Sequence, residues 1–231
     1  MARGVWVYHA RVERAAGDDD RRLALLSGAE RERWAAFRRE RDRRLYLLAH
    51  CLLRVALSRH GPLEPAEWRF TTPGTGRPEL VGGQAEPGLT FSLSHGGAVA
   101  ACAISTAGRV GVDVEPADRE VDPGVLDMVL APAERRLVDA GADAASRRRA
   151  FLGLWTAKEA YAKAVGEGLS LPLRELRITL EPPALALRGA PLAGWTLRWF
   201  EPGAGHVAAC VVEHGAGPAP AITVAELMPA A

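Results

Sequence analysis

The sequence reads GVDVEP at residues 111–116 and LWTAKEAYAK at residues 154–163, and these two stretches decide the predicted fold. The first alternates apolar and acidic residues, which indicates a β-strand with Asp113 and Glu115 on one face. The second has the spacing of a helix, with Glu159 and Lys163 four residues apart on one side. A strand with two carboxylates and a helix with a third beside lysines together indicate a magnesium site that handles a pyrophosphate.

Spacing alone leaves two interpretations of Asp113 and Glu115. Two carboxylates on one face repel each other unless a cation lies between them, and a hard cation with oxygen ligands suits such a pair. The alternative is a strand that ends at the surface with both carboxylates solvated. The two-residue spacing fits both interpretations equally well.

The helical pattern from about residue 145 to 165 ends at a Gly-Glu-Gly turn. Trp155, Glu159 and Lys163 follow one another at four-residue steps on this helix. A Glu–Lys pair at that spacing is commonly a solvated surface pair. However, Lys158 falls inside the apolar arc, where a charge needs a partner. We therefore expect this face of the helix to line a site.

The N-terminal part begins with a strand pattern at residues 5–12 and continues with one long helical pattern at residues 27–58. Ser27 and Glu30 have the capping-box spacing at the start of the helix. The first half of this helix contains Arg31, Arg33, Arg38, Arg39, Arg41, Arg43 and Arg44. Neighbouring acids favour a solvated face for most of these arginines, and one or two facing a phosphate is the alternative. The run at residues 18–20 is interpreted as a solvated loop or helix start, with a metal site as the alternative.

Two further segments carry weaker signals. TTPGTGRP at residues 71–78 is rich in glycine and proline, which suits a phosphate cradle or a plain hairpin connection. FSLSH at residues 91–95 ends a strand in a glycine turn. Ser94 and His95 point to opposite faces of that strand and the GxSxG pattern is absent, so a serine hydrolase is not indicated.

Composition excludes several classes. The formal net charge of the 231 residues is +1, which argues against a nucleic-acid binder. No stretch reaches the roughly 18 apolar residues of a membrane span. Cys51, Cys102 and Cys210 lie far apart without metal-ligand spacing, so reduced thiols in a cytoplasmic protein are expected.

The order of elements predicts an α+β fold made of two similar halves. Each half has a strand, a long helix and then several strands, with residues 1–107 in the first half and 108–231 in the second. No residue-level repeat supports the division. A pseudo-twofold arrangement of such halves would place a ligand in the cleft between them.

The two stretches resemble a known family. GVDVEP followed about 40 residues later by LWTAKEAYAKAVGEGLSLPL is similar to the signature pair of the 4′-phosphopantetheinyl transferases, and in particular of the large monomeric subgroup that activates peptide and polyketide synthetases. The arginine-rich first helix, the TTPGTGRP loop and the FSLSH strand end occur in the family's order. The resemblance covers roughly residues 30–173.

This resemblance implies roles for individual residues. Asp113, Glu115 and Glu159 would bind Mg²⁺, and Glu159 would also accept the proton of the attacking serine, directly or through a water. Lys163 would pair with phosphate charge during bond breaking, beside Asp113. On the other wall, Arg33 and His95 would hold the 3′-phosphate of coenzyme A, Gly76 and Arg77 would lie along its adenine and phosphates, and Ser94 would lie beside the phosphates. Relatives often have two basic residues at the first helix, and here Arg33 is the better match in register. Arg77 replaces a more frequent lysine.

The resemblance further implies an enzyme of the holo-[acyl-carrier-protein] synthase type. It would transfer 4′-phosphopantetheine from coenzyme A to a serine of an apo acyl or peptidyl carrier protein, leaving adenosine 3′,5′-bisphosphate. The carrier proteins would belong to fatty-acid, polyketide or nonribosomal peptide synthesis, and residues 121–137 would help to dock them. A monomer without nucleic-acid or membrane partners is expected. The alternative is a non-catalytic relative on the same fold that binds coenzyme A or carrier proteins.

Overall fold

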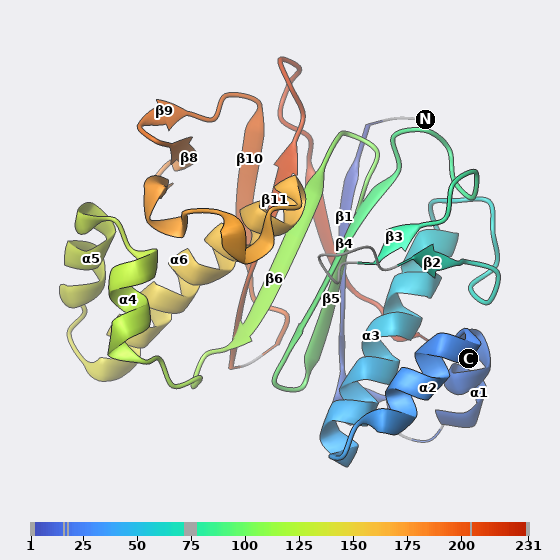
Figure 1. Ribbon diagram of the computed structural model, residues 1–231. Helices are drawn as coiled ribbons and strands as arrows, with labels where there is room; N and C mark the ends of the chain where they lie inside the picture. Colours follow the sequence, from blue (N-terminus) through green and yellow to red (C-terminus); the bar gives the residue numbers. More distant parts are fainter. Residues whose placement is uncertain (1–2, 16, 18, 72–77, 204, 230–231) are drawn as a thin grey trace.

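The computed structural model describes residues 3–229 apart from 16, 18, 72–77 and 204. The chain has an α+β fold in which two neighbouring sheets are each packed against one long helix (Figure 1). The two long helices, α3 and α6, lie on opposite sides of the central strands (Figure 1). This arrangement confirms the predicted fold class of two α+β halves.

The first sheet has the strand order β12-β1-β5-β4. Its strands are β1 (Val5–Arg11), β4 (Thr90–Gly96), β5 (Val99–Ser105) and β12 (Ile222–Glu226). β1 pairs antiparallel with β5 and parallel with β12. The last strand of the chain therefore completes the sheet of the N-terminal half. The division of the chain at residues 107 and 108 stays a prediction.

The helix predicted over residues 27–58 is two helices, α2 (Gly28–Ala36) and α3 (Glu40–Ser58). Phe37 and Arg39 are extended, with ψ angles of 130° and 132°. The break turns the Phe37 ring onto Tyr46 of α3, with 5.3 Å between ring centroids. This apolar contact is available only if α2 folds back on α3, and helical periodicity cannot reveal it.

The second sheet has the strand order β10-β11-β6. Its strands are β6 (Val110–Pro116), β10 (Trp195–Phe200) and β11 (His206–Glu213), and the helix that covers it is α6 (Ala144–Val165). Gly111 lets α6 approach closely, because a Cβ at this position would lie 1.8 Å from the carbonyl oxygen of Ala160. Gly166 ends α6 in a left-handed conformation with φ of 80°.

The remaining elements are short. They are η1 (Val12–Arg14), α1 (Asp19–Leu25), β2 (Phe70–Thr71), β3 (Glu79–Leu80), α4 (Pro123–Val129), α5 (Pro132–Asp139), η2 (Gly168–Ser170), η3 (Leu173–Glu175), β7 (Leu176–Leu180), β8 (Pro183–Leu187) and β9 (Ala190–Pro191). Among the described residues, no helix is long and apolar enough to cross a membrane.

The two sheets meet along β4, β5 and β6. A shared core packs Val112 and Val114 of β6 against Ala101 of β5 and Val7 of β1. The Ser92 hydroxyl accepts a hydrogen bond of 3.1 Å from the Val112 amide. Since alternate residues of a strand face opposite ways, Asp113 and Glu115 point away from this core. The acidic face of β6 is thereby directed toward α6.

Candidate functional site

Asp113 lies at the centre of a contact that joins β4, β6 and α6. Its side chain is buried, and Oδ1 accepts hydrogen bonds from the Ser94 hydroxyl at 2.8 Å and from Lys163 Nζ at 2.6 Å. Lys163 Nζ also lies 2.8 Å from Ser94 Oγ. Three of the predicted site residues, from three elements, are therefore in direct contact.

Glu115 lies two residues further along β6, facing the same helix. Its Oε1 accepts a hydrogen bond of 3.1 Å from Trp155 Nε1 and forms an ion pair with Arg119. The Arg119 guanidinium lies over the Trp155 ring, 5.3 Å from its centroid. Burial and the charge of Asp113 raise the pKa of Glu115, while Arg119 and the Trp155 hydrogen bond act in the opposite direction.

Glu159 is the third carboxylate, one helical turn before Lys163. Burial raises the pKa of Glu159, and the charges of Asp113 and Glu115 add to this, while Lys163 and Arg119 lower it. Each of the three acids thus lies within electrostatic range of the others. Mutual repulsion of this kind is what an added cation relieves.

Two buried carboxylate oxygens at this place have no hydrogen-bond partner within the described part of the chain, Asp113 Oδ2 and Glu159 Oε1. Buried anionic oxygens are costly without a donor or a metal. As the side chains are arranged here, no group of three or more His, Cys, Asp or Glu residues among those described is close enough to hold a metal ion. The donor chemistry nevertheless fits a hard cation, because all three candidates are carboxylates.

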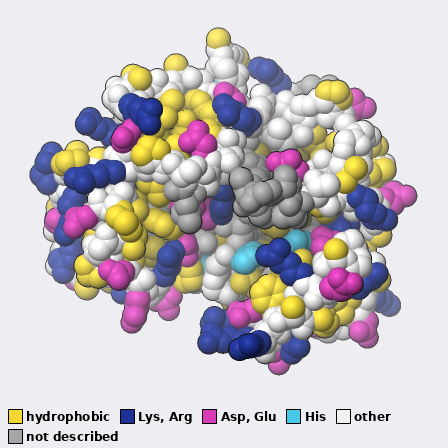
Figure 2. Space-filling view, viewed as in Figure 1, with side chains coloured by type: hydrophobic (Ala, Val, Ile, Leu, Met, Phe, Trp, Pro, Cys, Tyr) yellow, Lys and Arg dark blue, Asp and Glu magenta, His cyan; other side chains and the backbone are white. Residues whose placement is uncertain are grey.

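Two residues predicted to bind coenzyme A, His95 and Arg33, lie on β4 and α2. His95 shares a face of β4 with Phe91 and Leu93, which pack against α3. Its side chain lies at the rim. Burial lowers the pKa of His95, and the charges of His50 and Lys163 lower it further. Figure 2 shows basic and histidine side chains gathered in this part of the surface.

Arg33 is exposed on α2. Burial and the charge of Glu30 raise the pKa of Tyr46 to about 12. The charges of Arg33 and Arg54 act in the opposite direction. Tyr46 in turn stacks on His50, with 4.0 Å between ring centroids. The charge of Arg33 thus acts on Tyr46, and that of His50 acts on His95. The predicted residues Gly76 and Arg77 lie outside the described residues.

Grooves flank the site at both ends of β6. One of about 720 Å³ is lined by Gly97, Pro116, Arg148 and His206 among others. Another, of about 330 Å³, is lined by Thr90, Arg109 and Val165 among others. Each groove has walls from both halves, as the prediction of a ligand cleft between them requires.

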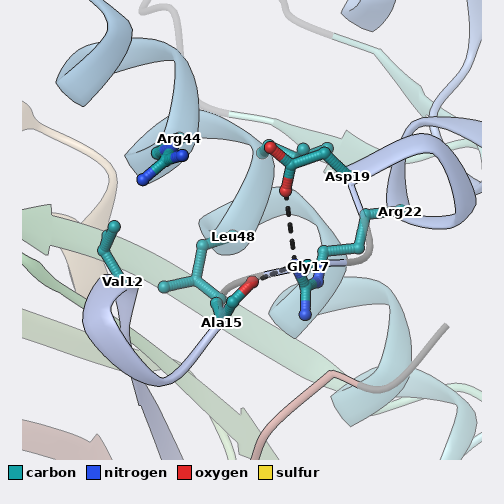
Figure 3. Close-up of a pocket in the computed structure, with 8 residues that line it drawn as sticks. Val12, Ala15, Gly17, Asp19, Arg22, Arg44 and Leu48 are labelled. Carbon is teal, nitrogen blue, oxygen red and sulfur yellow. Dashed lines mark hydrogen bonds and ion pairs between the residues drawn. The ribbon is translucent and has the colours of Figure 1, made fainter.

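A smaller pocket, of about 20 Å³, lies near the N-terminal acidic run (Figure 3). Its Arg22 donates to the Ala15 carbonyl and forms an ion pair of 3.3 Å with Asp19. Asp19 starts α1, which confirms the interpretation of this run as a helix start. The pocket is too small for a nucleotide.

Lys158 does not line the site, contrary to the expectation for this helix face. It is fully buried and donates to Glu134 Oε2 at 2.6 Å and to the carbonyls of Val129 and Leu173 at 2.7 and 2.9 Å. Its partner Glu134 also accepts hydrogen bonds from the Ala131 and Ile178 amides. The Lys158 charge on the core face of α6 is therefore neutralised by Glu134, and this buried ion pair connects α6 to α5.

Sequence reasoning missed several residues around the site. Arg119 follows Glu115 by four positions, but it lies beyond the end of the strand. Strand periodicity therefore does not predict where its side chain points. Glu30 was interpreted only as a capping residue and a surface counter-ion. It is in fact bound by His50 and Arg54 of α3. The four-residue steps from Tyr46 to His50 and Arg54 were a signal for a shared helix face.

Comparisons with known proteins bear on this site. Residues 109–211 match the model of the 4′-phosphopantetheinyl transferase superfamily, and residues 17–107 match that of the 4′-phosphopantetheinyl transferase N-terminal domain. The 4′-phosphopantetheinyl transferase HetI of Nostoc sp. is 33% identical over 191 residues, covering 82% of this chain and 79% of HetI. A 4′-phosphopantetheinyl transferase of Bacillus subtilis is 30% identical over 170 residues, covering 72% of each chain.

The match to solved structures is partial. The crystal structure of Thermotoga maritima holo-[acyl-carrier-protein] synthase is similar with 23% identity and a TM-score of 0.37. The match covers 46% of this chain and 62% of that one.

Proposed function

This chain belongs to the 4′-phosphopantetheinyl transferase superfamily and transfers 4′-phosphopantetheine from coenzyme A to a carrier protein, and we propose that the transfer takes place in the cleft between β4, β6 and α6. The observation that supports this place is the contact of Lys163 with Asp113 and Ser94. It joins both halves at one point, beside the other two carboxylates. A cation and acids held this rigidly suit the positioning that phosphoryl transfer demands.

Asp113, Glu115 and Glu159 are proposed to hold Mg²⁺. The unpaired Asp113 Oδ2 and Glu159 Oε1 support this set, as do the raised pKa values of Glu115 and Glu159, to which the charge of Asp113 contributes. When bound, the ion supplies positive charge that neutralises the diphosphate of coenzyme A. Trp155 and Arg119 orient the Glu115 carboxylate from the outer side.

Glu159 is proposed as the group that accepts the proton of the carrier serine. Its place on α6, one helical turn before Lys163 and beside Asp113 and Glu115, supports this role, because a base must lie within reach of the reacting phosphate. The serine Oγ forms a bond to the β-phosphorus, and the bond from that phosphorus to the bridging oxygen breaks. The electron pair leaves with adenosine 3′,5′-bisphosphate. Lys163, held by Asp113 and Ser94, lies where it can stabilise the charge of the phosphates.

The carrier protein is proposed to dock beside α4 and α5. Met128 and Leu137, within the predicted surface at residues 121–137, are 67% and 41% exposed. A groove of about 590 Å³ lined by Val121, Leu126 and Phe151 among others lies next to them. Exposed apolar side chains beside a groove favour a protein partner. We also propose that the enzyme acts as a monomer in the cytoplasm, and the three buried free cysteines favour that reducing compartment.

The test is a transfer assay. The protein is incubated with Mg²⁺, coenzyme A and apo-carrier proteins of fatty-acid, polyketide and peptide synthesis, and mass spectrometry detects one phosphopantetheinyl group on the serine. Glu159→Gln is expected to lower the rate by about 100-fold or more while circular dichroism stays unchanged. Glu201→Gln, which breaks an exposed pair with Arg149, is the matched control and should keep the rate. A near-normal rate in Glu159→Gln would remove this carboxylate from the proposal, and no transfer to any carrier would refute the proposed function.

A further inference from the structure

The two oxygens of the Asp113 carboxylate have unequal surroundings. Both donors that reach it, the Ser94 hydroxyl at 2.8 Å and Lys163 Nζ at 2.6 Å, bind Oδ1. The other oxygen, Oδ2, is buried and has no hydrogen-bond partner within the described part of the chain. A buried carboxylate oxygen without a donor or a metal is costly. The arrangement therefore leaves one defined oxygen of Asp113 for something that the protein binds.

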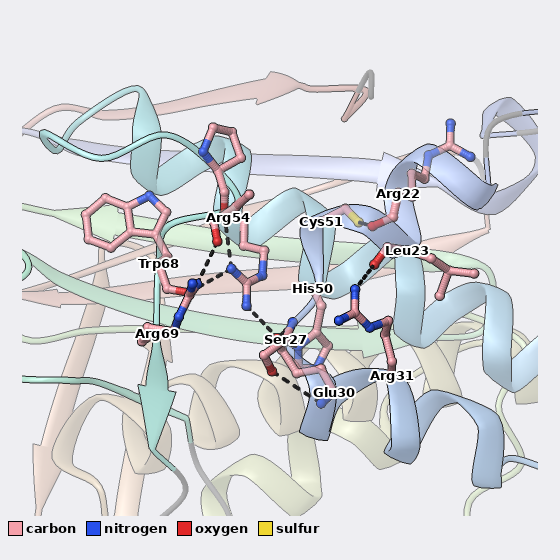
Figure 4. A network of polar contacts seen from close by, with 12 residues as sticks. Arg22, Leu23, Ser27, Glu30, Arg31, His50, Cys51, Arg54, Trp68 and Arg69 are labelled. Atoms are coloured by element: carbon pink, nitrogen blue, oxygen red, sulfur yellow. Dashed lines mark hydrogen bonds and ion pairs between the residues drawn. The ribbon is translucent and has the colours of Figure 1, made fainter.

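Two other carboxylates in the interior show that this fold can satisfy both oxygens of an acid. In the network between α2 and α3 (Figure 4), Glu30 Oε1 lies 2.9 Å from His50 Nδ1 and Glu30 Oε2 accepts from Arg54 at 2.5 Å. Glu134 accepts from a lysine at Oε2 and from a backbone amide at Oε1. Both of these acids connect structural elements. Asp113 differs from them because its two donors share one oxygen.

The positions of the protons in the contact follow from what each group can donate. Lys163 forms an ion pair with Asp113, and its ammonium only donates. Ser94 Oγ must therefore accept the bond of 2.8 Å that joins it to Lys163 Nζ. The ionised Asp113 only accepts, so the single hydroxyl proton of Ser94 is donated to Oδ1. Ser94 has no second proton to give to a phosphate oxygen.

The same contact fixes the direction of the Asp113 carboxylate. Ser94 belongs to β4 and Lys163 to α6, so the two donors reach Oδ1 from different elements. The carboxylate cannot turn without losing at least one of these hydrogen bonds. Oδ2 and Glu159 Oε1 are then the two buried oxygens of the site without a donor among the described residues. Oxygens of this kind suit a hard cation.

We infer that Ser94 is a positioning residue of the metal site, whose hydroxyl binds Asp113 Oδ1 together with Lys163 so that Oδ2 is the oxygen presented to the ion. This role differs from the phosphate contact that the family resemblance implies for Ser94. It rests on the proposed function, because the ion belongs to the same cleft. Groups that orient a metal ligand typically change metal affinity 10- to 100-fold when they are removed.

The test separates metal affinity from phosphate affinity. Electron paramagnetic resonance gives the dissociation constant of Mn²⁺ with and without saturating coenzyme A, and calorimetry gives that of coenzyme A in the presence of EDTA. Ser94→Ala is expected to raise the dissociation constant of Mn²⁺ about 10- to 100-fold and to leave that of coenzyme A in EDTA within about twofold. Ser94→Thr keeps the hydroxyl and should recover most of the Mn²⁺ affinity.

The matched control is the other serine on the same face of β4. Ser92 is also buried, and its hydroxyl accepts a hydrogen bond of 3.1 Å from the Val112 amide of β6. Ser92→Ala therefore removes a hydroxyl between the same two strands without touching a carboxylate, and it should change neither dissociation constant. Normal Mn²⁺ affinity in Ser94→Ala overturns the inference. An equal loss of Mn²⁺ affinity in Ser92→Ala, or a loss of coenzyme A affinity in EDTA for Ser94→Ala, does so too.

A crystal structure of the unaltered protein with Mn²⁺ and coenzyme A covers the case in which the Ser94 variants do not fold. Mn²⁺ is expected on Asp113 Oδ2, with Ser94 Oγ still bound to Oδ1. Mn²⁺ on Oδ1, a site without Mn²⁺, or Ser94 Oγ bound to a phosphate oxygen overturns the inference. Failure of the proposed function looks different, because the unaltered protein would then transfer nothing to any carrier protein, whatever its affinity for Mn²⁺.

Discussion

Replacing Glu30 by glutamine tests the network between α2 and α3 through its charge. Burial by itself raises the pKa of Glu30, but hydrogen bonds from His50 and the Ser27 amide, together with the charge of Arg54, lower it from 4.5 to about 2. A lowering of this size corresponds to about 3 kcal/mol of folding free energy at pH 7. The side chain is only 13% exposed, so little of this is lost to solvent screening. Glu30→Gln is therefore expected to lower the free energy of unfolding by about 3 kcal/mol at pH 7.

The pH dependence of this loss has a definite sign. Because the folded-state pKa lies below the unfolded value, the contribution is complete above about pH 4.5 and disappears as the pH falls toward 2. Urea denaturation of both proteins between pH 7 and pH 3 should show a difference that shrinks with acid. Glu201→Gln, which removes an exposed carboxylate, should stay within about 1 kcal/mol of the unaltered protein. A loss below about 1 kcal/mol at pH 7, or one that does not change with pH, would refute the reasoning.

Two further predictions concern buried contacts of α6. Lys158→Met should lower the free energy of unfolding by about 3–5 kcal/mol in urea denaturation, because it leaves the Glu134 carboxylate buried without its counter-charge. A loss under about 1 kcal/mol would show that the pair is not what fastens α6 to α5. Trp155→Phe should weaken binding of Mn²⁺, followed by electron paramagnetic resonance, about 10- to 100-fold, since Glu115 loses the donor that orients it. Trp199→Phe, which removes an indole hydrogen bond to a helix carbonyl, is the control, and equal affinities in the two variants would contradict the positioning role.

The sequence was sufficient for the parts of the site that depend on local periodicity. Two-residue alternation placed Asp113 and Glu115 on one face, and four-residue steps placed Trp155 beside Glu159 and Lys163. These patterns repeat within one element, so each can be read without knowing its neighbours. The capping box at Ser27 was likewise correct, with both of its hydrogen bonds formed.

Contacts between distant elements were beyond the reach of the sequence. Lys158 was expected at the site because a charge in an apolar arc needs a partner, and its partner Glu134 lies 24 residues earlier on α5. Nothing in either residue's local pattern indicates that pairing. The helix break at Phe37 has the same cause, since its benefit is an apolar contact with Tyr46 across the turn. Tertiary packing overrode a continuous helical pattern in that segment.

The closeness of the three site elements follows from small side chains rather than from the charged ones. A Cβ at Gly96 would lie 2.5 Å from the Val114 carbonyl oxygen, and one at Gly111 would lie 1.8 Å from that of Ala160. β6 therefore lies so close to β4 and to α6 that only glycine fits at each of these two contacts. With the backbones this close, Ser94 is long enough to reach Asp113, and Lys163 meets both of them. The charged residues are thus held at fixed positions by the packing of the sheets, which spares the enzyme the cost of ordering them when its substrates bind.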